Sequence, residues 1–572
     1  MGVKKLVRKV VLKTAKKRGR AQLNKFDRST VNATRKNLSL LFRLISDNEE
    51  TEYGKKYDFK HIRTVEDYKK NVPLTVYDDY EEYIDRMTEH GERNLLTSYP
   101  IAFYASTSGT SGSPKKIPVS NKGLKIFQNH SATTQVAIIS EFYENTTGKG
   151  SYEGAVLLLL SLSHEPLKDG VDFGSISSAC MDEEKQKVLG YFSTTPTEVL
   201  SCTQNTDLKY LHARYALAEN DLYLIAGAYI PAFVDLMNYI KDNHTTIVDD
   251  IRKGTISPDI AMPDSLRKKL ISKLKPNPKR ADELEAAFAD GFNEDVMTRI
   301  WPKLQAVSAI WAGNFNLYAR KLQQFSGRNI PYYTNTYVSS EGVFGLARHP
   351  FDQSYVMIPK SCFYEFIPMD GPNADDDNVE TVLMDEVEEG KEYELVITNQ
   401  SGFYRYRMGD VIRVVGFYNE APMVEFKYRK KNIVSIAGEK FTEDHLLSAI
   451  REFERRSGVA IIDYCMYPDR DAEPGRYVII LEPDEKVPAS RKDECIKILG
   501  EELARASTSY AHYLHGGNMG EPRIIFLQPQ TFMLQREMKM YKTGLSENQL
   551  KTPRVLTTKE QISFFNALEE EY

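Results

Sequence analysis

Short apolar runs rich in β-forming residues alternate with long helical patterns along this chain of 572 residues. Helical periodicity dominates residues 28–48 and again residues 206–252, whereas the β-rich runs are short and bounded by turn-forming residues. Strands that alternate with helices are typical of α/β layers, so we expect a mixed α/β fold. The predicted strands cover residues 101–105, 155–160, 330–338, 355–358, 363–367, 393–398 and 411–415.

A change of composition near residue 428 predicts a domain boundary. The strand-like run 411–415 is followed by a polar segment and then by a basic stretch, residues 427–431, after which a new strand–helix pattern begins. We therefore expect a large domain over residues 1–427 and a smaller α/β domain over residues 428–572, which is long enough for one domain.

The first 26 residues are the one strongly biased segment. Ten lysines and arginines precede the first acidic residue, Asp27. The apolar residues of this segment share one face of a predicted helix: Val3, Leu6, Val7, Val10 and Val11. Such a basic amphipathic helix either docks its apolar stripe on the domain or acts as a membrane-surface helix or targeting peptide. The docked helix is favoured, and interspersed lysines argue against a secretory signal.

Composition excludes several classes of protein. The net charge of −5 argues against general nucleic-acid binding, which needs a broad basic surface. No apolar stretch approaches the ~20 residues that cross a bilayer, so we expect no integral membrane span. The five cysteines are scattered without a CxxC pair, which argues against a disulfide framework or thiolate zinc site and favours a cytoplasmic, reducing location. The sequence signatures of zinc proteases, α/β-hydrolases and P-loop nucleotidases are missing.

Glycines, hydroxyls and a lysine gather in residues 106–115, directly after a predicted strand. Glycines allow sharp turns, successive backbone N–H groups form an anion-binding nest, and Lys115 adds a positive charge. Composition alone favours a flexible Ser/Gly linker. The position after a strand, with Lys116-Ile117-Pro118 directly behind, instead favours a polyphosphate site.

An aromatic ring, two hydroxyls and a carboxylate lie at the end of the run 330–338 and in the residues directly after it. Tyr337 can stack on a base, Ser340 can donate to a phosphate oxygen, and Glu341 can hold Mg²⁺ together with water and phosphates. The same Ser-Ser-Glu tripeptide is equally compatible with a helix N-cap.

Asp410 follows a glycine just before the predicted strand 411–415. A carboxylate at such a strand edge can accept both ribose hydroxyls, and a β-turn in which the aspartate bonds its own backbone is an equal alternative. Two basic stretches, residues 431–440 and 544–554, come later. Lys551 in the second can neutralise charge on a transferring phosphoryl group, although each stretch alone is an ordinary basic loop.

In this order and spacing, these stretches resemble the motifs of the adenylate-forming superfamily of acyl-CoA ligases, peptide-synthetase adenylation domains and luciferases. The resemblance is carried by residues 107–115 (phosphate loop TSGTTGxPK), 337–341 (YGxTE), 407–410 (RTGD) and 429–438 (hinge). Within the superfamily, the chain is most similar to the Gretchen Hagen family of acyl acid–amido synthetases, which is marked by STSGTS, YxSSE and YRYRxGD. Three further stretches fit that family: residues 51–54, 249–254 and 300–302.

The resemblance implies a large N-terminal adenylation domain of mixed sheets flanked by helices, a small mobile C-terminal α/β lid, and the cofactors ATP and Mg²⁺. Residue by residue, it assigns nucleotide binding to Ser108, Gly109, Thr110, Ser111, Gly112, Thr336, Tyr337, Ser340, Asp410 and Arg429. Lys115 and Lys551 would be catalytic, Glu341 would bind Mg²⁺, and Lys431 would lie at the hinge.

A further stretch, residues 210–229, resembles the part of the family that lines the acyl pocket. It contains Tyr215 and Ala228, the two candidates for substrate binding. Aromatic helix faces belong more often to the core, so a purely structural role is the alternative.

The implied activity is that of an acid–amino acid ligase, which activates a small carboxylic acid as acyl-AMP and transfers the acyl group to an amino-acid amine. An acyl-CoA ligase, or another acyl-adenylate-forming ligase, is the nearest alternative. A non-catalytic nucleotide-binding protein is the alternative from another class. We expect small-molecule partners only and a monomer; the sequence identifies neither the acid nor the amine.

Overall fold

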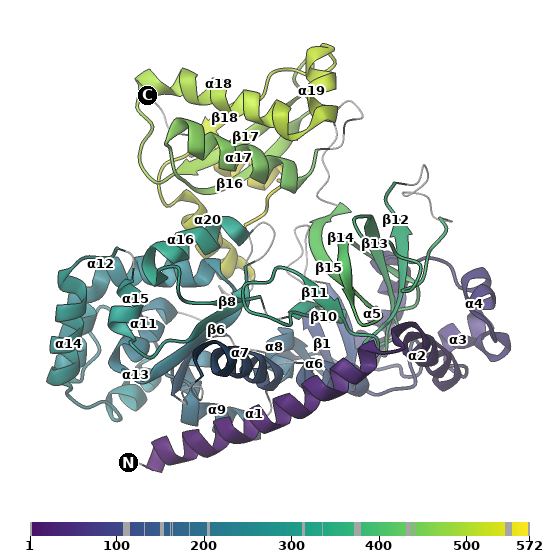
Figure 1. Ribbon diagram of the computed structural model, residues 1–572, viewed down its shortest axis with the longest axis horizontal. Coiled ribbons are helices and arrows are strands. Elements are labelled where there is room, and N and C mark those ends of the chain that lie inside the picture. The colour runs from purple at the N-terminus through teal and green to yellow at the C-terminus, as the bar shows by residue number, and fades with distance from the viewer. Residues whose placement is uncertain are drawn as a thin grey trace. The chain divides into compact units, whose positions relative to one another are not determined.

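The computed structural model gives a chain that divides into two compact units (Figure 1). The first comprises Met1–Thr107, Lys115–Met408 and Ile412–Phe426, and the second Ser108–Pro114, Gly409–Val411 and Lys427–Tyr572. The structure describes residues 3–106, 115–130, 132–148, 154–160, 162, 164–181, 183–202, 206–293, 295–311, 315–334, 336–370, 379–430, 436, 439, 441–543 and 552–569.

Helices precede the first strand. They are α1 (Val3–Thr30), α2 (Ala33–Asp47), α3 (Glu52–Lys56), α4 (Val65–Asn71) and α5 (Glu81–His90), with 3₁₀ turns at Phe59–His61 and Tyr77–Tyr80. Thr64 closes a capping box on α4, because its side chain accepts from the Asp67 N–H while the Asp67 carboxylate accepts from the Thr64 N–H. Such a reciprocal cap fixes where the helix begins.

A four-stranded sheet in the order β2-β1-β5-β4 follows. Its strands are β1 (Ile101–Ser106), β2 (Lys116–Ser120), β4 (His164–Pro166) and β5 (Asp172–Gly174), with helices α6 (Asn121–Asn129), α7 (Ala132–Thr147) and α8 (Ile176–Ala179). Ser106 pairs with Lys116 in the antiparallel β1–β2 ladder, so the glycine-rich stretch connects two neighbouring strands. The predicted strand 101–105 is therefore confirmed.

A second four-stranded sheet, β3-β6-β7-β8, is parallel throughout. Its strands are β3 (Ala155–Leu159), β6 (Leu222–Tyr229), β7 (Ala306–Ile310) and β8 (Tyr332–Tyr333). The helices in this part of the chain are α9 (Glu183–Phe192), α10 (Thr197–Leu200), α11 (Leu208–Ala218), α12 (Pro231–Lys253), α13 (Asp264–Ile271), α14 (Pro278–Ala289), α15 (Val296–Ile300) and α16 (Asn316–Ser326). They enclose a hydrophobic core of their own around Trp301.

A seven-stranded sheet has the order β12-β13-β14-β15-β11-β10-β9. Its strands are β9 (Thr336–Ser339), β10 (Gly342–Leu346), β11 (Tyr355–Met357), β12 (Phe363–Pro368), β13 (Glu392–Thr398), β14 (Tyr406–Tyr418) and β15 (Ala421–Arg429). Together with the β1–β2 region and the first helices it surrounds the largest hydrophobic core.

The C-terminal unit is an α/β structure with the three-stranded sheet β16-β17-β18. Its elements are α17 (Glu443–Ser457), β16 (Ile461–Asp469), β17 (Arg476–Pro483), α18 (Ala489–Ala506), α19 (Thr508–His515), β18 (Arg523–Phe526), α20 (Thr531–Thr543) and α21 (Lys559–Asn566). The mixed α/β class predicted from the alternation of strands and helices is confirmed in both units.

Two sequence expectations about secondary structure are wrong in part. Residues 206–252 are not one helical region, because strand β6 separates α11 from α12. A strand buried on both faces has no polar alternation and reads like a helix core, which explains the error. The run 330–338 likewise divides into β8 and β9, which belong to different sheets.

Helix α1 docks on the domain, but the predicted face contributes only in part: Val7 and Val11 are half-buried. Leu6 and Val10, in the middle of the predicted apolar stripe, are 54% and 58% exposed. The buried face is instead made by Arg8, Leu12, Gly19, Leu23 and Phe26, which also recur at helical spacing. The prediction is therefore wrong in part, because the buried positions include a glycine that approaches α7 closely and an arginine paired with Glu219, which an apolar pattern does not mark. Among the described residues, no helix is long and apolar enough to cross a bilayer.

Candidate nucleotide site

The predicted base- and phosphate-binding residues lie on a tight hairpin between β9 and β10. Ser339 pairs with Gly342, so Ser340 and Glu341 form the two-residue connection between the strands. The Ser-Ser-Glu tripeptide therefore caps no helix, and the N-cap alternative is wrong. A two-residue connection exposes the side chains at its tip while the strands fix its position.

A long-range hydrogen bond ties this hairpin to the strand that leads into the glycine-rich stretch. The Ser340 hydroxyl donates to the carbonyl oxygen of Ser106 at 3.0 Å, across 234 residues of sequence. Ser106 is the last residue of β1, so two of the predicted motifs meet at its carboxyl end. Some predicted site residues lie outside the described residues: Ser108, Gly109, Thr110, Ser111, Gly112, Lys431 and Lys551.

Glu341 is half-buried, and neighbouring polar groups orient it. The Ser339 hydroxyl donates to Glu341 Oε2 at 2.6 Å, and the Asn399 amide donates to the Glu341 carbonyl oxygen at 2.9 Å. A carboxylate held in this way offers hard oxygen atoms, the ligand type that Mg²⁺ takes alongside substrate phosphates. Asn399 was missed by sequence reasoning, because nothing near it in the chain marks it.

Lys115 stands directly before β2 and is half-exposed. Its ammonium group lies 4.0 Å from the centroid of the Tyr77 ring and 3.9 Å from an Asp78 carboxylate oxygen. Burial raises the pKa of Tyr77 to about 12, so the ring stays a neutral phenol whose face attracts the cation. The lysine is thus presented at one end of the glycine-rich stretch.

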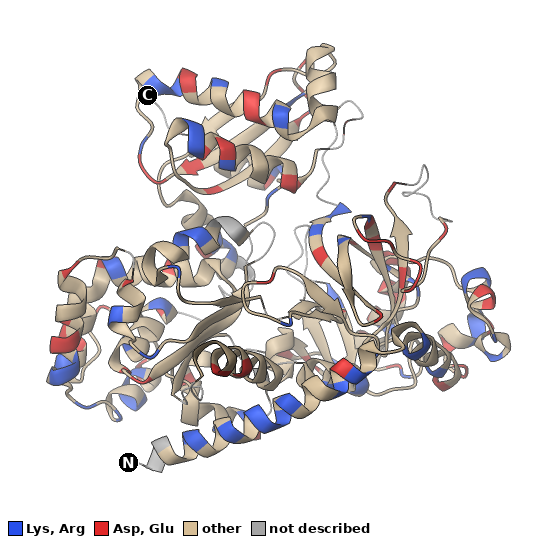
Figure 2. Cartoon of the chain, viewed as in Figure 1, with Lys and Arg blue, Asp and Glu red and all other residues tan. Residues whose placement is uncertain are grey.

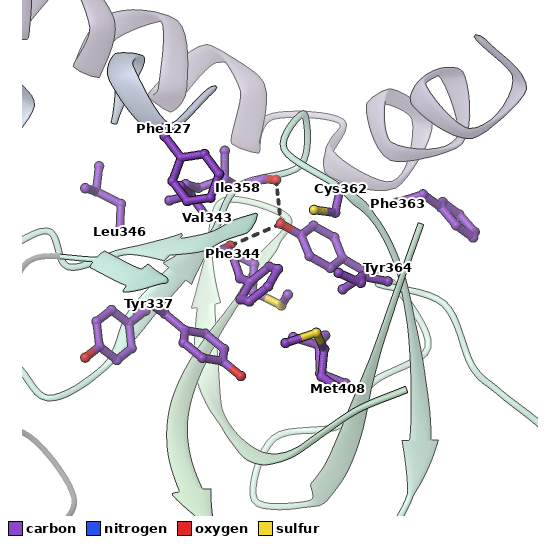
Figure 3. Packing of buried hydrophobic residues seen from close by; sticks show 14 of the residues in the cluster. Phe127, Tyr337, Val343, Phe344, Leu346, Ile358, Cys362, Phe363, Tyr364 and Met408 are labelled. Carbon is purple, nitrogen blue, oxygen red and sulfur yellow. Dashed lines mark hydrogen bonds between the residues drawn. The ribbon is translucent and has the colours of Figure 1, made fainter. Parts of the chain in front are cut away.

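Tyr337 and Thr336 are buried on β9, at 6% and 7% exposure. The Tyr337 ring meets Phe344 edge-on at 5.1 Å, and it contacts Tyr355 and Phe426 at 5.8 and 6.2 Å. Figure 3 shows this packing on the hairpin side of the core.

Beside the hairpin, the Tyr364 hydroxyl donates to the carbonyl oxygens of Phe344 and Ile358, each at 3.2 Å (Figure 3). Tyr364 itself is fully buried. These contacts hold the strands of the hairpin firmly while its tip remains accessible.

Asp410 and Arg429, predicted from separate stretches, form an ion pair at 2.6 Å. Asp410 lies inside strand β14 and is 2% exposed, whereas the Arg429 side chain at the end of β15 is 46% exposed. Gly409 has φ +69°, a left-handed conformation that favours glycine. The carboxylate is therefore part of a strand and paired with a cation, rather than closing an isolated β-turn.

Residues directly before Asp410 anchor the strand instead of facing a ligand. The Arg405 guanidinium binds the buried Glu365 carboxylate, at 3.0 Å for the shortest contact, and donates to the carbonyl oxygens of Lys69 and Val72, each at 2.9 Å. Tyr404 is fully buried and stacks on Tyr53 at 4.9 Å. Sequence reasoning missed these anchors, since their partners are far away in the chain.

The other family-like stretches also have packing roles. Asp250 accepts hydrogen bonds from Tyr210, Thr255 and Ser257, and the Trp301 indole N–H donates to the Ala216 carbonyl oxygen at 2.9 Å. These contacts join the helices of the parallel-sheet region.

The two substrate-binding candidates have different surroundings. Tyr215 on α11 is partly buried against the second core, and burial raises its pKa to about 12. Ala228 is exposed near the carboxyl end of β6. The environment of Tyr215 is that of a core residue, and a substrate role for either residue stays a prediction.

Comparison with known proteins gives consistent matches along the chain. The GH3 family N-terminal domain matches residues 22–331, the GH3 family central domain residues 355–429, and the GH3 family C-terminal domain residues 444–560. The probable indole-3-acetic acid-amido synthetase GH3.11 of Oryza sativa subsp. japonica is 28% identical, covering 96% of each chain. The 4-substituted benzoates-glutamate ligase GH3.12 of Arabidopsis thaliana is 28% identical, covering 91% of this chain and 92% of its own.

Solved structures agree with these matches. The GH3.15 acyl acid amido synthetase superposes with a TM-score of 0.83 at 26% identity, covering 96% of each chain. A 2-hydroxyisobutyryl-CoA ligase, at a TM-score of 0.51 and 10% identity over 93% of this chain and 90% of its own, shares the fold only. Because the matched family domains follow one another in order and the first alone spans more than half of the chain, this protein belongs to the GH3 family.

Proposed function

We propose that this protein is an ATP-dependent acyl acid–amido synthetase, an acid–amino acid ligase that works through an acyl-adenylate. The observation that carries the proposal is the hydrogen bond from Ser340 to Ser106, which joins the hairpin to the strand entering the glycine-rich stretch. Membership of the GH3 family and the names of the relatives, which include amido synthetases and a benzoate–glutamate ligase, support the same activity.

The first half-reaction activates the acid. A carboxylate oxygen of the acid attacks the α-phosphorus of ATP, the bond from that phosphorus to the oxygen bridging it to the β-phosphate breaks, and pyrophosphate leaves. The task of the protein is to hold the two reactants in line and to stabilise the charge that develops on the phosphoryl oxygens. Lys115, Ser340 and the backbone N–H groups of residues 108–112 would supply positive charge and donors for this step.

The remaining nucleotide contacts follow the family assignment. Asp410 would bind the ribose and Tyr337 would contact the adenine, with Thr336 and Arg429 as further nucleotide-binding residues. Glu341 would hold Mg²⁺, which would supply positive charge against the phosphates; a single oriented carboxylate suits an ion that takes most ligands from water and substrate.

In the second half-reaction the amino-acid amine attacks the acyl carbon, the bond to AMP breaks, and an amide forms. No nucleophilic side chain is needed, in agreement with the state of the thiols. Burial raises the pKa of Cys362 to about 12 and that of Cys180 to about 11, so neither is a thiolate near neutral pH. All five cysteines are free, which is compatible with the cytoplasmic location we propose.

We further propose that residues 1–427 form the adenylation domain and residues 428–572 a mobile lid, with Lys431 at the hinge and Lys551 as a second catalytic lysine. Closure of a lid would exclude water, which would otherwise hydrolyse the acyl-adenylate. A lid that changes position between half-reactions would also let Lys551 act on adenylation without blocking the amine.

Carboxylate-dependent exchange of labelled pyrophosphate into ATP tests the activity. A panel with indole-3-acetate, substituted benzoates and other small acids is measured with ATP and Mg²⁺, and exchange is expected with at least one acid. Active acids are then combined with each common amino acid or with CoA, and the products are identified by mass spectrometry. Amide formation supports the proposal, whereas exchange that leads only to a CoA thioester assigns the protein to the acyl-CoA ligases. Nucleotide binding without exchange for any acid would overturn the ligase proposal.

A further inference from the structure

The outward face of helix α1 carries two exposed apolar residues near its amino end, where solvent should favour polar side chains. Leu6 and Val10 are 54% and 58% exposed, although both lie on a well-formed helix of 28 residues. Lys13 and Lys17 continue the same stripe toward the carboxyl end, at the helical spacing of three and four residues, and both are exposed. The stripe therefore begins apolar and becomes basic.

The opposite face of α1 fixes which side points outward. A Cβ on Gly19 would lie 2.1 Å from the carbonyl oxygen of Thr133 in α7, so only glycine allows this close approach of α1 and α7. Arg8 is buried, pairs with Glu219 at 3.2 Å and donates to the carbonyl oxygen of Tyr191 at 3.1 Å. Such contacts keep Leu6 and Val10 on the side of α1 that faces away from the domain.

Positive charge surrounds the exposed apolar residues. Figure 2 shows lysines and arginines along the length of α1, with acidic colour only near its carboxyl end. The exposed basic residues on this helix are Lys9, Lys13, Lys17, Arg18, Arg20, Lys25 and Arg28. Of the acids near α1, Glu144 is paired with Arg20 at 2.5 Å, Glu219 with Arg8, and Asp27 stands at the carboxyl end.

We propose that the outward face of α1 binds an anionic membrane surface, with Leu6 and Val10 entering the interface and the lysines contacting lipid phosphates and carboxylates. Stable peripheral binding takes two weak signals, and here a small apolar insertion is combined with a basic stripe. Charge complementarity identifies the partner: helix α1 carries eleven lysines and arginines against one acidic residue, Asp27, whereas the chain as a whole has a net charge of −5. A nucleic acid would use the lysines but would leave the apolar residues in water.

The inference is independent of the proposed ligase activity. The match to the family domains begins at residue 22, so most of the exposed basic stripe precedes it. Binding of α1 to lipid would hold the enzyme at a membrane surface, where amphipathic carboxylic acids collect.

Sedimentation of the full-length protein with lipid vesicles tests the proposal. Wild-type protein should bind phosphatidylcholine vesicles that contain phosphatidylserine, bind pure phosphatidylcholine vesicles weakly, and dissociate as salt is raised. The triple variant Lys9→Gln, Lys13→Gln, Lys17→Gln should bind about a hundredfold less tightly, since each lysine near an anionic surface contributes about fivefold. The double variant Leu6→Ser, Val10→Ser should lose about tenfold.

A matched control removes equal charge from another surface. Lys268, Lys275 and Lys279 are exposed on or beside α13 and α14, and their replacement by glutamine should leave vesicle binding within twofold of wild type. If both triple variants lose vesicle binding equally, binding depends on the net charge of the protein and not on helix α1, and the proposal is overturned. Wild-type protein that ignores phosphatidylserine vesicles, or that binds duplex DNA more tightly than vesicles, would overturn it as well. Circular dichroism melting and pyrophosphate exchange should be unchanged in all variants.

Discussion

Two motif stretches of the larger unit look alike in sequence and differ in structure. The β9–β10 hairpin and the segment Tyr404–Arg407 each combine tyrosine with charged or hydroxyl side chains. At the hairpin tip, Ser340 and Glu341 are half-buried and have short-range or backbone partners. In the second segment the buried Arg405 and the half-buried Arg407 bind buried carboxylates elsewhere in the chain, Arg405 with Glu365 and Arg407 with Glu394.

The difference separates residues that present chemistry from residues that hold a strand. The half-buried Glu341 carboxylate keeps lone pairs for a ligand. The buried Arg405, in contrast, donates its N–H groups to four residues of the protein. Substitutions should therefore affect activity at the hairpin and stability at the anchor.

The largest effect is expected for Arg405→Ala. It leaves the Glu365 carboxylate, 1% exposed, without its cation, and loss of one partner of a buried pair costs about 3–5 kcal/mol. Urea unfolding followed by circular dichroism measures the loss. Arg455→Ala is the control, because its pair with Glu452 is exposed and should contribute less than about 1 kcal/mol. Equal effects of the two substitutions would contradict the anchor role.

Much of the fold could be predicted from the sequence because turn-forming residues bound the strands. The strand that precedes the glycine-rich stretch, and the one that carries Tyr337, were located in this way, whereas β2 on its other side was not predicted. The family motifs led to the hairpin residues. The mixed α/β class and the family are both confirmed.

Long-range partners could not be predicted. Arg405 binds a carboxylate 40 residues away, and Ser340 donates to a backbone 234 residues away. Strand β6 was missed because it is apolar on both faces, and the buried face of α1 includes Gly19 and Arg8 while Val10 stays exposed. In each case packing between distant segments outweighs the local pattern.

Glu341→Gln should have the next largest effect, on activity alone. It removes the negative charge at the hairpin tip but keeps the shape and the hydrogen bond from Ser339. Pyrophosphate exchange should fall about a hundredfold to a thousandfold, the usual range for loss of one group that stabilises a transition state. Glu420→Gln, on the exposed turn between β14 and β15, should change neither exchange nor melting temperature. Full exchange in Glu341→Gln would exclude the magnesium role.

His212 extends the comparison to the stretch that resembles the acyl-pocket region. It is buried on α11 with Nδ1 2.9 Å from the Thr195 hydroxyl, and burial lowers its pKa to about 4. The unfolded chain, with a histidine pKa near 6.5, binds the proton more tightly between these values, so stability falls as the pH drops. As the pH falls from 7 to 5, protonation of His212 in the unfolded chain should lower the free energy of unfolding by about 2 kcal/mol.

Urea unfolding at several pH values, compared between wild type and His212→Gln, isolates that contribution. The variant should lose less stability than wild type over this interval. The same pH dependence in both proteins would show that His212 is not an acid-sensitive anchor.

Ser340→Ala should have the smallest effect, and it tests whether the Ser340 hydroxyl binds a ligand or only holds the hairpin in place. The hydroxyl joins the hairpin to the carbonyl oxygen of Ser106, and in the proposed function it turns its single O–H to a phosphate oxygen when ATP is bound. Loss of one neutral donor should reduce exchange about tenfold and lower the free energy of unfolding by about 1 kcal/mol. Ser340→Thr keeps the donor and should restore most of both. If Ser340→Ala loses stability without losing exchange, the hydroxyl is a structural anchor like Arg405. The hairpin tip would then contain one structural residue, Ser340, beside one ligand-binding residue, Glu341.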